Sequence, residues 1–289
     1  FSFVATSHSL WWNNIKPVFV DIQPTDYNID PKKIEAAISP RTTAILAVHV
    51  YDNPADVSAI QEIAETYGLR VIYDAAHTFD VRINDLPVLS FGDMSVLSFH
   101  ATKVFTTFEG GAIVSKDAAT KKRIDYLKNF GFAGETTVVA PGINAKMNEF
   151  SAALGLYQLG YVDEAIRKRQ LVSEIYDKEL SSIEGIILPH RQSDVKACYS
   201  YYPIRIMQNS RKSRDEVYEE LKKYGIHTRR YFYPLISNLP TYRGLDSSKK
   251  DNLPIANEVA DTILCLPLYS DIGDDAIKVV NALKSIFQK

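Results

Sequence analysis

The sequence predicts an α/β fold: a large domain built on a mainly parallel sheet, followed by a smaller α+β domain. Over the first half of the chain, short apolar runs alternate with segments whose apolar residues recur at helical spacing. Polar residues follow the ends of these runs, which is typical of parallel strands that carry a site at their carboxyl ends. The alternation stops near residue 160, so we expect a large domain over residues 1–160 and a small one over 161–289.

The elements of the large domain follow from these patterns. Residues 43–49 form a continuous apolar run, as expected of a strand covered on both faces, and residues 69–73 have the pattern of another buried strand. Asp30 and Pro31 have the residue types of a helix N-cap and first turn, and Gly68 is a typical helix end. The expected strands are residues 17–21, 43–49, 69–73, 95–99 and 111–115, and the expected helices are 30–38, 57–67 and 118–129.

The second half has a different pattern, with longer helices and few strands. Helices are expected at residues 147–159, 162–180, 213–224 and 274–287, with a strand at 201–207. A loop rich in aromatic residues covers 231–242. Arg229 and Arg230 beside it have the chemistry to meet a diphosphate through bidentate hydrogen bonds.

Composition excludes several classes of protein. The formal net charge is −2, so no broad electrostatic field favours nucleic acid or a membrane surface. Two cysteines cannot form a disulfide framework, and although one pair is possible, we expect a reduced cytosolic setting. No apolar run reaches the roughly 18 residues of a membrane span. The chain opens at Phe1 within an apolar pattern, so we expect that an N-terminal part of the protein precedes it.

Lys103 is the first candidate for chemistry. It closes the stretch SFHATK at residues 98–103, just after an expected strand, and EGG follows at residues 109–111. A lysine condenses with an aldehyde only when its pKa is lowered, which burial and neighbouring cations achieve. A solvated surface lysine is the ordinary alternative.

Asp74 is the second candidate, at the end of the buried strand 69–73. A carboxylate here can pair with the protonated nitrogen of a pyridine ring and make that ring an electron sink. The small Ala76 leaves room for a flat ring close to the backbone, and Ser98 offers a hydroxyl to a phosphate. Alternatively, Asp74 is an ordinary turn residue at the end of its strand. A metal site with His77 and Asp80 is disfavoured, because no further ligands accompany them, so we expect no metal.

In order and spacing, these stretches resemble the DegT/DnrJ/EryC1/StrS aminotransferases, which act on nucleotide-linked keto sugars. The resemblance covers essentially the whole chain. The stretches that carry it are FSFVAT (1–6), KPVFVD (16–21), YNID (27–30), VHVY (48–51), DAAH (74–77), SFHATK (98–103), EGG (109–111), GIN (142–144), AALGLYQL (152–159) and YPL (233–235).

The resemblance implies a fold-type I enzyme that depends on pyridoxal 5'-phosphate. Lys103 matches the Schiff-base lysine, which also moves a proton between the amino donor and the cofactor. Asp74 matches the acid on the pyridine nitrogen. His77 matches the residue on the ring oxygen, and Ser98 matches a phosphate ligand.

Two further matches concern the edges of the site. Phe3 matches the aromatic residue stacked over the cofactor ring. Asn144 matches a residue that reaches the phosphate of the neighbouring subunit's cofactor, which implies a homodimer with shared active sites. Members of the family also carry a Gly-Thr phosphate loop that would lie before Phe1. Relatives usually have Gly after the tyrosine matched by Tyr51, whereas this chain has Asp52; Lys146 stands where Arg is common.

Within the family, residues 71–77, 98–105 and 128–132 are most similar to transaminases that make dTDP-4-amino-4,6-dideoxyglucose. The resemblance therefore implies transfer of an amino group from L-glutamate to a dTDP-linked 4-keto-6-deoxy sugar. Amination at C3 of the sugar, or of a GDP-4-keto sugar, stays open. A dehydratase of the family would carry histidine in place of Lys103. A non-catalytic regulatory protein that binds the cofactor is the alternative of another class. A dehydrogenase is disfavoured, because no G-x-G-x-x-G follows a strand.

Overall fold

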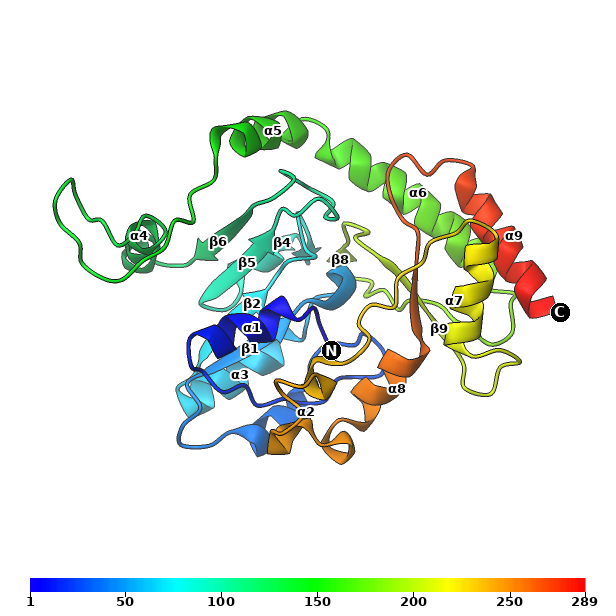
Figure 1. Ribbon diagram of the computed structural model, residues 1–289, viewed down its shortest axis with the longest axis horizontal. Helices are drawn as coiled ribbons and strands as arrows, with labels where there is room; N and C mark the ends of the chain where they lie inside the picture. Colours follow the sequence, from blue (N-terminus) through cyan, green and yellow to red (C-terminus); the bar gives the residue numbers. More distant parts are fainter. Residues whose placement is uncertain (289) are drawn as a thin grey trace.

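The structure is a computed structural model that describes residues 1–288 (Figure 1). The α-helices are α1 (Ala5–Trp12), α2 (Pro31–Ile34), α3 (Val57–Tyr67), α4 (Ala118–Leu127), α5 (Glu149–Leu159), α6 (Val162–Leu180), α7 (Arg214–Lys223), α8 (Pro254–Thr262) and α9 (Asp275–Gln288). The strands are β1 (Ala44–Val48), β2 (Arg70–Asp74), β3 (Arg82–Ile83), β4 (Leu86–Pro87), β5 (Met94–Ser98), β6 (Gly111–Ser115), β7 (Ile186–Ile187), β8 (Val195–Lys196), β9 (Tyr202–Ile206) and β10 (Ile263–Leu266). Short 3-10 helices are η1 (Glu35–Ala37), η2 (Val50–Asp52), η3 (Val88–Ser90), η4 (Ile236–Asn238), η5 (Asp246–Ser248) and η6 (Lys250–Asn252).

The main sheet has the order β1-β2-β5-β6. Strands β1, β2 and β5 are parallel, and β6 is an antiparallel edge strand. Helix α3 packs on this sheet through Ile60 and Ala64, which share a core with Val71. Asp56 caps α3 by accepting a hydrogen bond from Ala59 N, and Gly68 ends it at φ 64°. The parallel strands and this helix confirm the predicted α/β fold class.

The second half forms a separate core of helices α6, α7 and α9 around the antiparallel sheet β10-β9-β7. Tyr176, Leu221 and Leu283 are among its fully buried side chains. A third sheet, β4-β3-β8, joins the two halves, since β8 pairs with β3. Another core cluster also combines Ile22 with Val259, so both halves contribute to it. A domain division at residue 160 stays a prediction.

The strand expected at residues 17–21 is wrong. This segment has no partner in the main sheet. Its backbone bonds instead run to a nearby turn, from Asp30 N to Asp21 O and from Gln23 N to Asn28 O, with one bridge between Ile22 and Ile29. An apolar run forms a strand only when a neighbouring strand takes its backbone groups, and local sequence does not supply that neighbour.

An arm, defined as residues 128–159, lies outside these layers. Figure 1 shows α4 and α5 at the periphery, with the segment between them looping away from the sheet. Its apolar side chains face solvent: Ile143, Phe150 and Leu156 are 69%, 89% and 75% exposed. Clustered exposure of this kind on one element is typical of a surface that another chain covers.

Candidate active site

Asp74 lies at the carboxyl end of β2, inside the main sheet. Its Oδ1 accepts a hydrogen bond from Ala76 N at 3.1 Å, and its Oδ2 accepts one from the Thr6 hydroxyl at 2.7 Å. Each carboxylate oxygen has capacity for a further donor. The two bonds fix the orientation of the carboxylate and leave it able to pair with a cationic group above the strand end.

Lys103 lies in the loop after β5, the strand next to β2. Burial lowers the pKa of its amine, and the Asp74 carboxylate acts in the opposite direction. Its Nζ lies 5.9 Å from the centre of the Tyr201 ring. The structure therefore places a lysine of lowered pKa close enough to Asp74 for the two charges to interact.

His77 is buried beside this pair and is held in one tautomer. Its Nδ1 accepts a hydrogen bond from Tyr51 N at 3.2 Å. Burial, and secondarily the charge of Lys103, lowers the pKa of His77 well below its usual value, so the ring is neutral at pH 7. A neutral imidazole that accepts at Nδ1 carries its proton on Nε2. His77 therefore presents a donor to any oxygen placed at Nε2.

Ser98 ends β5 on the same side of the sheet as Asp74. Val96 is the register partner of Asp74, and Ser98 is the next residue that points to the same face. Its Oγ accepts a hydrogen bond from His100 N at 3.3 Å. Since a hydroxyl that accepts from the backbone keeps its own proton for donation, Ser98 can donate to an anion.

Phe3 and Asn144 are exposed to solvent in the single chain. Phe3 is 56% exposed just before α1. Asn144 is exposed on the arm, where its Oδ1 accepts from Lys146 Nζ at 2.8 Å. The structure thus brings together Lys103, Asp74 and His77, with Ala76 bonded to Asp74 and Ser98 on the next strand, and leaves Phe3 and Asn144 at the surface.

Two residues of the site were not predicted from the sequence. The hydroxyl of Thr6 orients Asp74 across 68 positions of the chain. The ring of Tyr201 lies 4.9 Å from the ring of His77, centre to centre, and covers Lys103 from one side. Neither residue stands in a pattern that marks such a role, because both contacts depend on how distant segments meet.

Arg229 and Arg230 differ in their surroundings. Arg230 bonds Asp215 at 2.9 Å, and its guanidinium lies 4.5 Å from the centre of the Tyr218 ring. Arg229 is exposed, and its backbone pairs with Cys265. Arg230 is therefore already engaged by a carboxylate, and Arg229 is the more exposed of the two residues.

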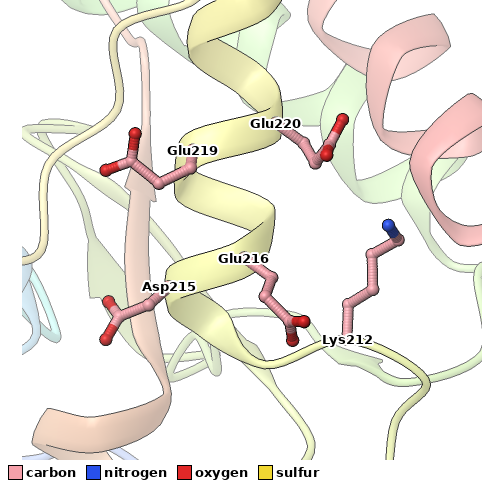
Figure 2. A pocket seen from close by; sticks show the side chains of 5 residues that line it. All are labelled: Lys212, Asp215, Glu216, Glu219 and Glu220. Atoms are coloured by element: carbon pink, nitrogen blue, oxygen red, sulfur yellow. The ribbon is translucent and has the colours of Figure 1, made fainter.

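A surface cavity of about 340 Å³ lies elsewhere, on α7 (Figure 2). Figure 2 shows four carboxylates and Lys212 around it. The acids Asp215, Glu216, Glu219 and Glu220 are bonded respectively to Arg230, Ser213, Lys222 and Lys223. Within residues 1–288, no group of three or more His, Cys, Asp or Glu side chains is arranged to hold a metal ion. The candidate site therefore stays at Lys103 and Asp74.

No helix within residues 1–288 has the length and apolarity needed to cross a membrane.

The DegT/DnrJ/EryC1/StrS aminotransferase family model matches residues 1–284 of the chain. The sequence is 51% identical over 284 residues, 98% of this chain and 76% of the relative, to a dTDP-4-amino-4,6-dideoxy-D-glucose transaminase of Escherichia coli. It is 46% identical over 287 residues, 99% of this chain and 78% of the relative, to a transaminase of the same description from Shigella dysenteriae. The fold is similar to that of DesI in the presence of its TDP-sugar product, with a TM-score of 0.94 and 36% identity over 100% of this chain and 73% of that one.

Proposed function

Because the chain belongs to the DegT/DnrJ/EryC1/StrS aminotransferase family, we propose that it aminates the C4 carbonyl of dTDP-4-keto-6-deoxyglucose. L-glutamate is the proposed amino donor, and 2-oxoglutarate and dTDP-4-amino-4,6-dideoxyglucose are the products. The enzyme is a sugar aminotransferase whose cofactor is pyridoxal 5'-phosphate. The observation that carries the proposal is the pairing of a lysine of lowered pKa with an oriented carboxylate at the strand ends.

The described residues fit this cofactor. A carboxylate with free acceptor capacity, Asp74, suits the protonated ring nitrogen. The Nε2–H of His77 suits the ring oxygen, and the Ser98 hydroxyl suits a phosphate oxygen. Ala76 is small enough to leave space for a flat ring. When bound, pyridoxal phosphate supplies an aldehyde that takes up the amino group and a ring that withdraws electrons from the adjacent carbon.

Lys103 is the proposed acid and base. Burial lowers the pKa of Nζ, which favours the free amine that removes the proton from the α-carbon of glutamate. In the second half-reaction the same Nζ delivers a proton to C4 of the sugar. Asp74 keeps the ring nitrogen protonated throughout, and Thr6 and Ala76 hold that carboxylate in place. Phe3 is the proposed stacking residue.

The function is tested by incubating the purified enzyme with L-glutamate and a panel of keto sugars. We expect dTDP-4-keto-6-deoxyglucose to be converted to a product heavier by the mass change of amination, with the nitrogen on C4 by NMR. A GDP-4-keto sugar and a dTDP-3-keto sugar complete the panel. Preferred turnover of either would contradict the proposed substrate. Failure to release 2-oxoglutarate from glutamate alone would contradict transamination itself.

We also propose that two copies of the chain form a dimer with shared active sites. The arm supports this proposal, because its apolar side chains are exposed on a segment that extends from the body (Figure 1). Phe150 and Leu156 lie on α5, and Asn144 lies at the surface of the same arm. An arm that packs on a second copy would bury these apolar groups and bring Asn144 to the partner's phosphate site.

A double variant of α5, Phe150→Glu with Leu156→Glu, tests the dimer. We expect a monomer by light scattering and a loss of activity of at least about tenfold, since two charges cannot be buried in an apolar interface. Ile277→Glu is the control, because Ile277 is also exposed, at 42%, but lies on α9. A variant that stays dimeric would exclude α5 as the interface, and a fully active monomer would exclude shared sites.

A further inference from the structure

Asp52 is a buried carboxylate that binds the backbone of a distant segment. Its side chain lies at the junction of the two halves, and the residue is 2% exposed. Oδ2 accepts hydrogen bonds from Cys198 N at 3.0 Å and Tyr199 N at 2.7 Å. Oδ1 accepts from Ser200 N at 3.3 Å and from the Ser200 hydroxyl at 3.0 Å. One side chain therefore satisfies three consecutive N–H groups of a segment that follows β8.

The backbone at Asp52 has an unusual left-handed conformation. Tyr51 and Asp52 are consecutive non-glycine residues with φ values of 54° and 62°. This left-handed region costs energy for an L-residue and persists only where the surroundings enforce it. Tyr199, on the other side of the junction, also has φ 54°. The four hydrogen bonds of Asp52 link these two strained turns to each other.

Two basic side chains contact the same segment. Arg169 of α6 donates from Nη1 to Tyr199 O at 3.3 Å, and the guanidinium of Arg191 lies 4.9 Å from the centre of the Tyr199 ring. Burial raises the pKa of Asp52 to about 6, while Arg191 and the Ser200 hydrogen bonds act against this shift. Asp52 is therefore ionised at neutral pH and accepts all four bonds as a charged group.

The segment leads directly to the active site. Tyr201 follows Ser200, and its ring contacts His77 at 4.9 Å between centres and lies 5.9 Å from Lys103 Nζ. Burial lowers the pKa of Lys103, and the Tyr201 ring is one of the groups that lie beside its amine. The position of Tyr201 is set by the backbone that precedes it.

We propose that Asp52 is a positioning residue for transamination: its carboxylate holds the backbone of residues 198–200 so that Tyr201 stays packed against Lys103 and His77. This inference rests on the role proposed for Lys103. At the position after Tyr51, this chain uses an acid to tie its second half to the strand ends of the first.

The variant Asp52→Gly removes the carboxylate and keeps the turn, because glycine adopts φ near 62° without strain. We expect hydrogen exchange at the amides of residues 198–200 to become roughly tenfold faster or more, the effect of losing hydrogen bonds to a charged acceptor. Asp52→Asn, which also tolerates this turn, should show the increase at Ser200 only, since its amide oxygen can still accept from Cys198 N and Tyr199 N whereas its amide nitrogen cannot accept from Ser200 N. This readout does not depend on the cofactor.

The second readout is the pH midpoint at which the nitrogen that joins Lys103 to the cofactor loses its proton. This midpoint is followed by visible absorbance. With Tyr201 released, Lys103 is more hydrated, and we expect this midpoint to rise by about one pH unit in Asp52→Gly. Tyr201→Ala should give the same rise. The double variant should resemble Tyr201→Ala alone, because both changes act through one ring. Additive shifts would overturn the proposal.

Lys196→Ala is the matched control. Lys196 lies on β8 in the same segment and pairs with Asp80 at 2.6 Å, so its loss weakens another attachment of that segment without touching Asp52. We expect no change in hydrogen exchange at residues 198–200 or in the pH midpoint of Lys103.

Unchanged hydrogen exchange in Asp52→Gly would overturn the proposal. Borohydride reduction followed by peptide mapping separates the two inferences: cofactor on another lysine would refute the role of Lys103, whereas cofactor on Lys103 with an unshifted midpoint would refute only the role of Asp52.

Discussion

Lys103→Ala should abolish turnover while leaving the fold intact. The variant lacks both the amine that forms the covalent bond to the cofactor and the base that moves the proton. Loss of the proton-transfer role alone lowers a rate by roughly two to four orders of magnitude. The fold should persist because, in the described part of the chain, Lys103 Nζ has no hydrogen-bond or ion-pair partner to leave unpaired. Its amine lies 5.9 Å from the centre of the Tyr201 ring and interacts electrostatically with the Asp74 carboxylate.

Three measurements check this expectation: the glutamate half-reaction, borohydride trapping of the cofactor, and thermal unfolding. Lys103→Arg keeps a positive charge without an amine that can condense, so it should be as inactive as alanine. Lys116→Ala, at an exposed lysine on the loop after β6, is the control that should behave as the parent enzyme. Normal turnover in Lys103→Ala would end the assignment of this residue and, with it, the proposed site.

Asp74→Asn should lower kcat by about two to three orders of magnitude, the usual effect of removing one electrostatic group that acts on developing charge. An amide cannot hold the ring nitrogen in its protonated form as a carboxylate does. The local structure should survive, since the asparagine oxygen can accept from Ala76 N, and its amide nitrogen can donate to the Thr6 hydroxyl. The loss should therefore fall on catalysis more than on stability.

Single-turnover kinetics with glutamate, together with retention of cofactor after dialysis, separate weak binding from slow chemistry in this variant. Asp56→Asn provides the control, because Asp56 is the N-cap of α3 and asparagine is an equally good cap. A kcat for Asp74→Asn within a few-fold of the parent enzyme would show that the carboxylate does not act on the ring nitrogen.

Local sequence was enough to predict most helices and strands. The apolar run at residues 44–48 forms β1 beside β2, although only one of its faces, with Ile45 and Ala47, is fully buried. Helix α3 begins at the cap Asp56 and ends at Gly68 as its sequence indicates. The stretches that contain Asp74 and Lys103 marked the chemistry, since a lysine and an acid that each follow a buried strand meet at one edge of a parallel sheet. These features depend on neighbours within a few residues.

Contacts between distant segments were decided by the tertiary structure alone. Thr6 reaches Asp74 across 68 positions, and Asp52 reaches Tyr199 across 147. A serine, threonine or aspartate makes such bonds only where folding brings a donor or acceptor to it, and its own neighbours carry no record of that partner. The failed strand at residues 17–21 has the same cause, because a backbone forms a strand only beside another strand. Sequence therefore determined which groups can do the chemistry, and packing between segments far apart in the chain decided how they are held.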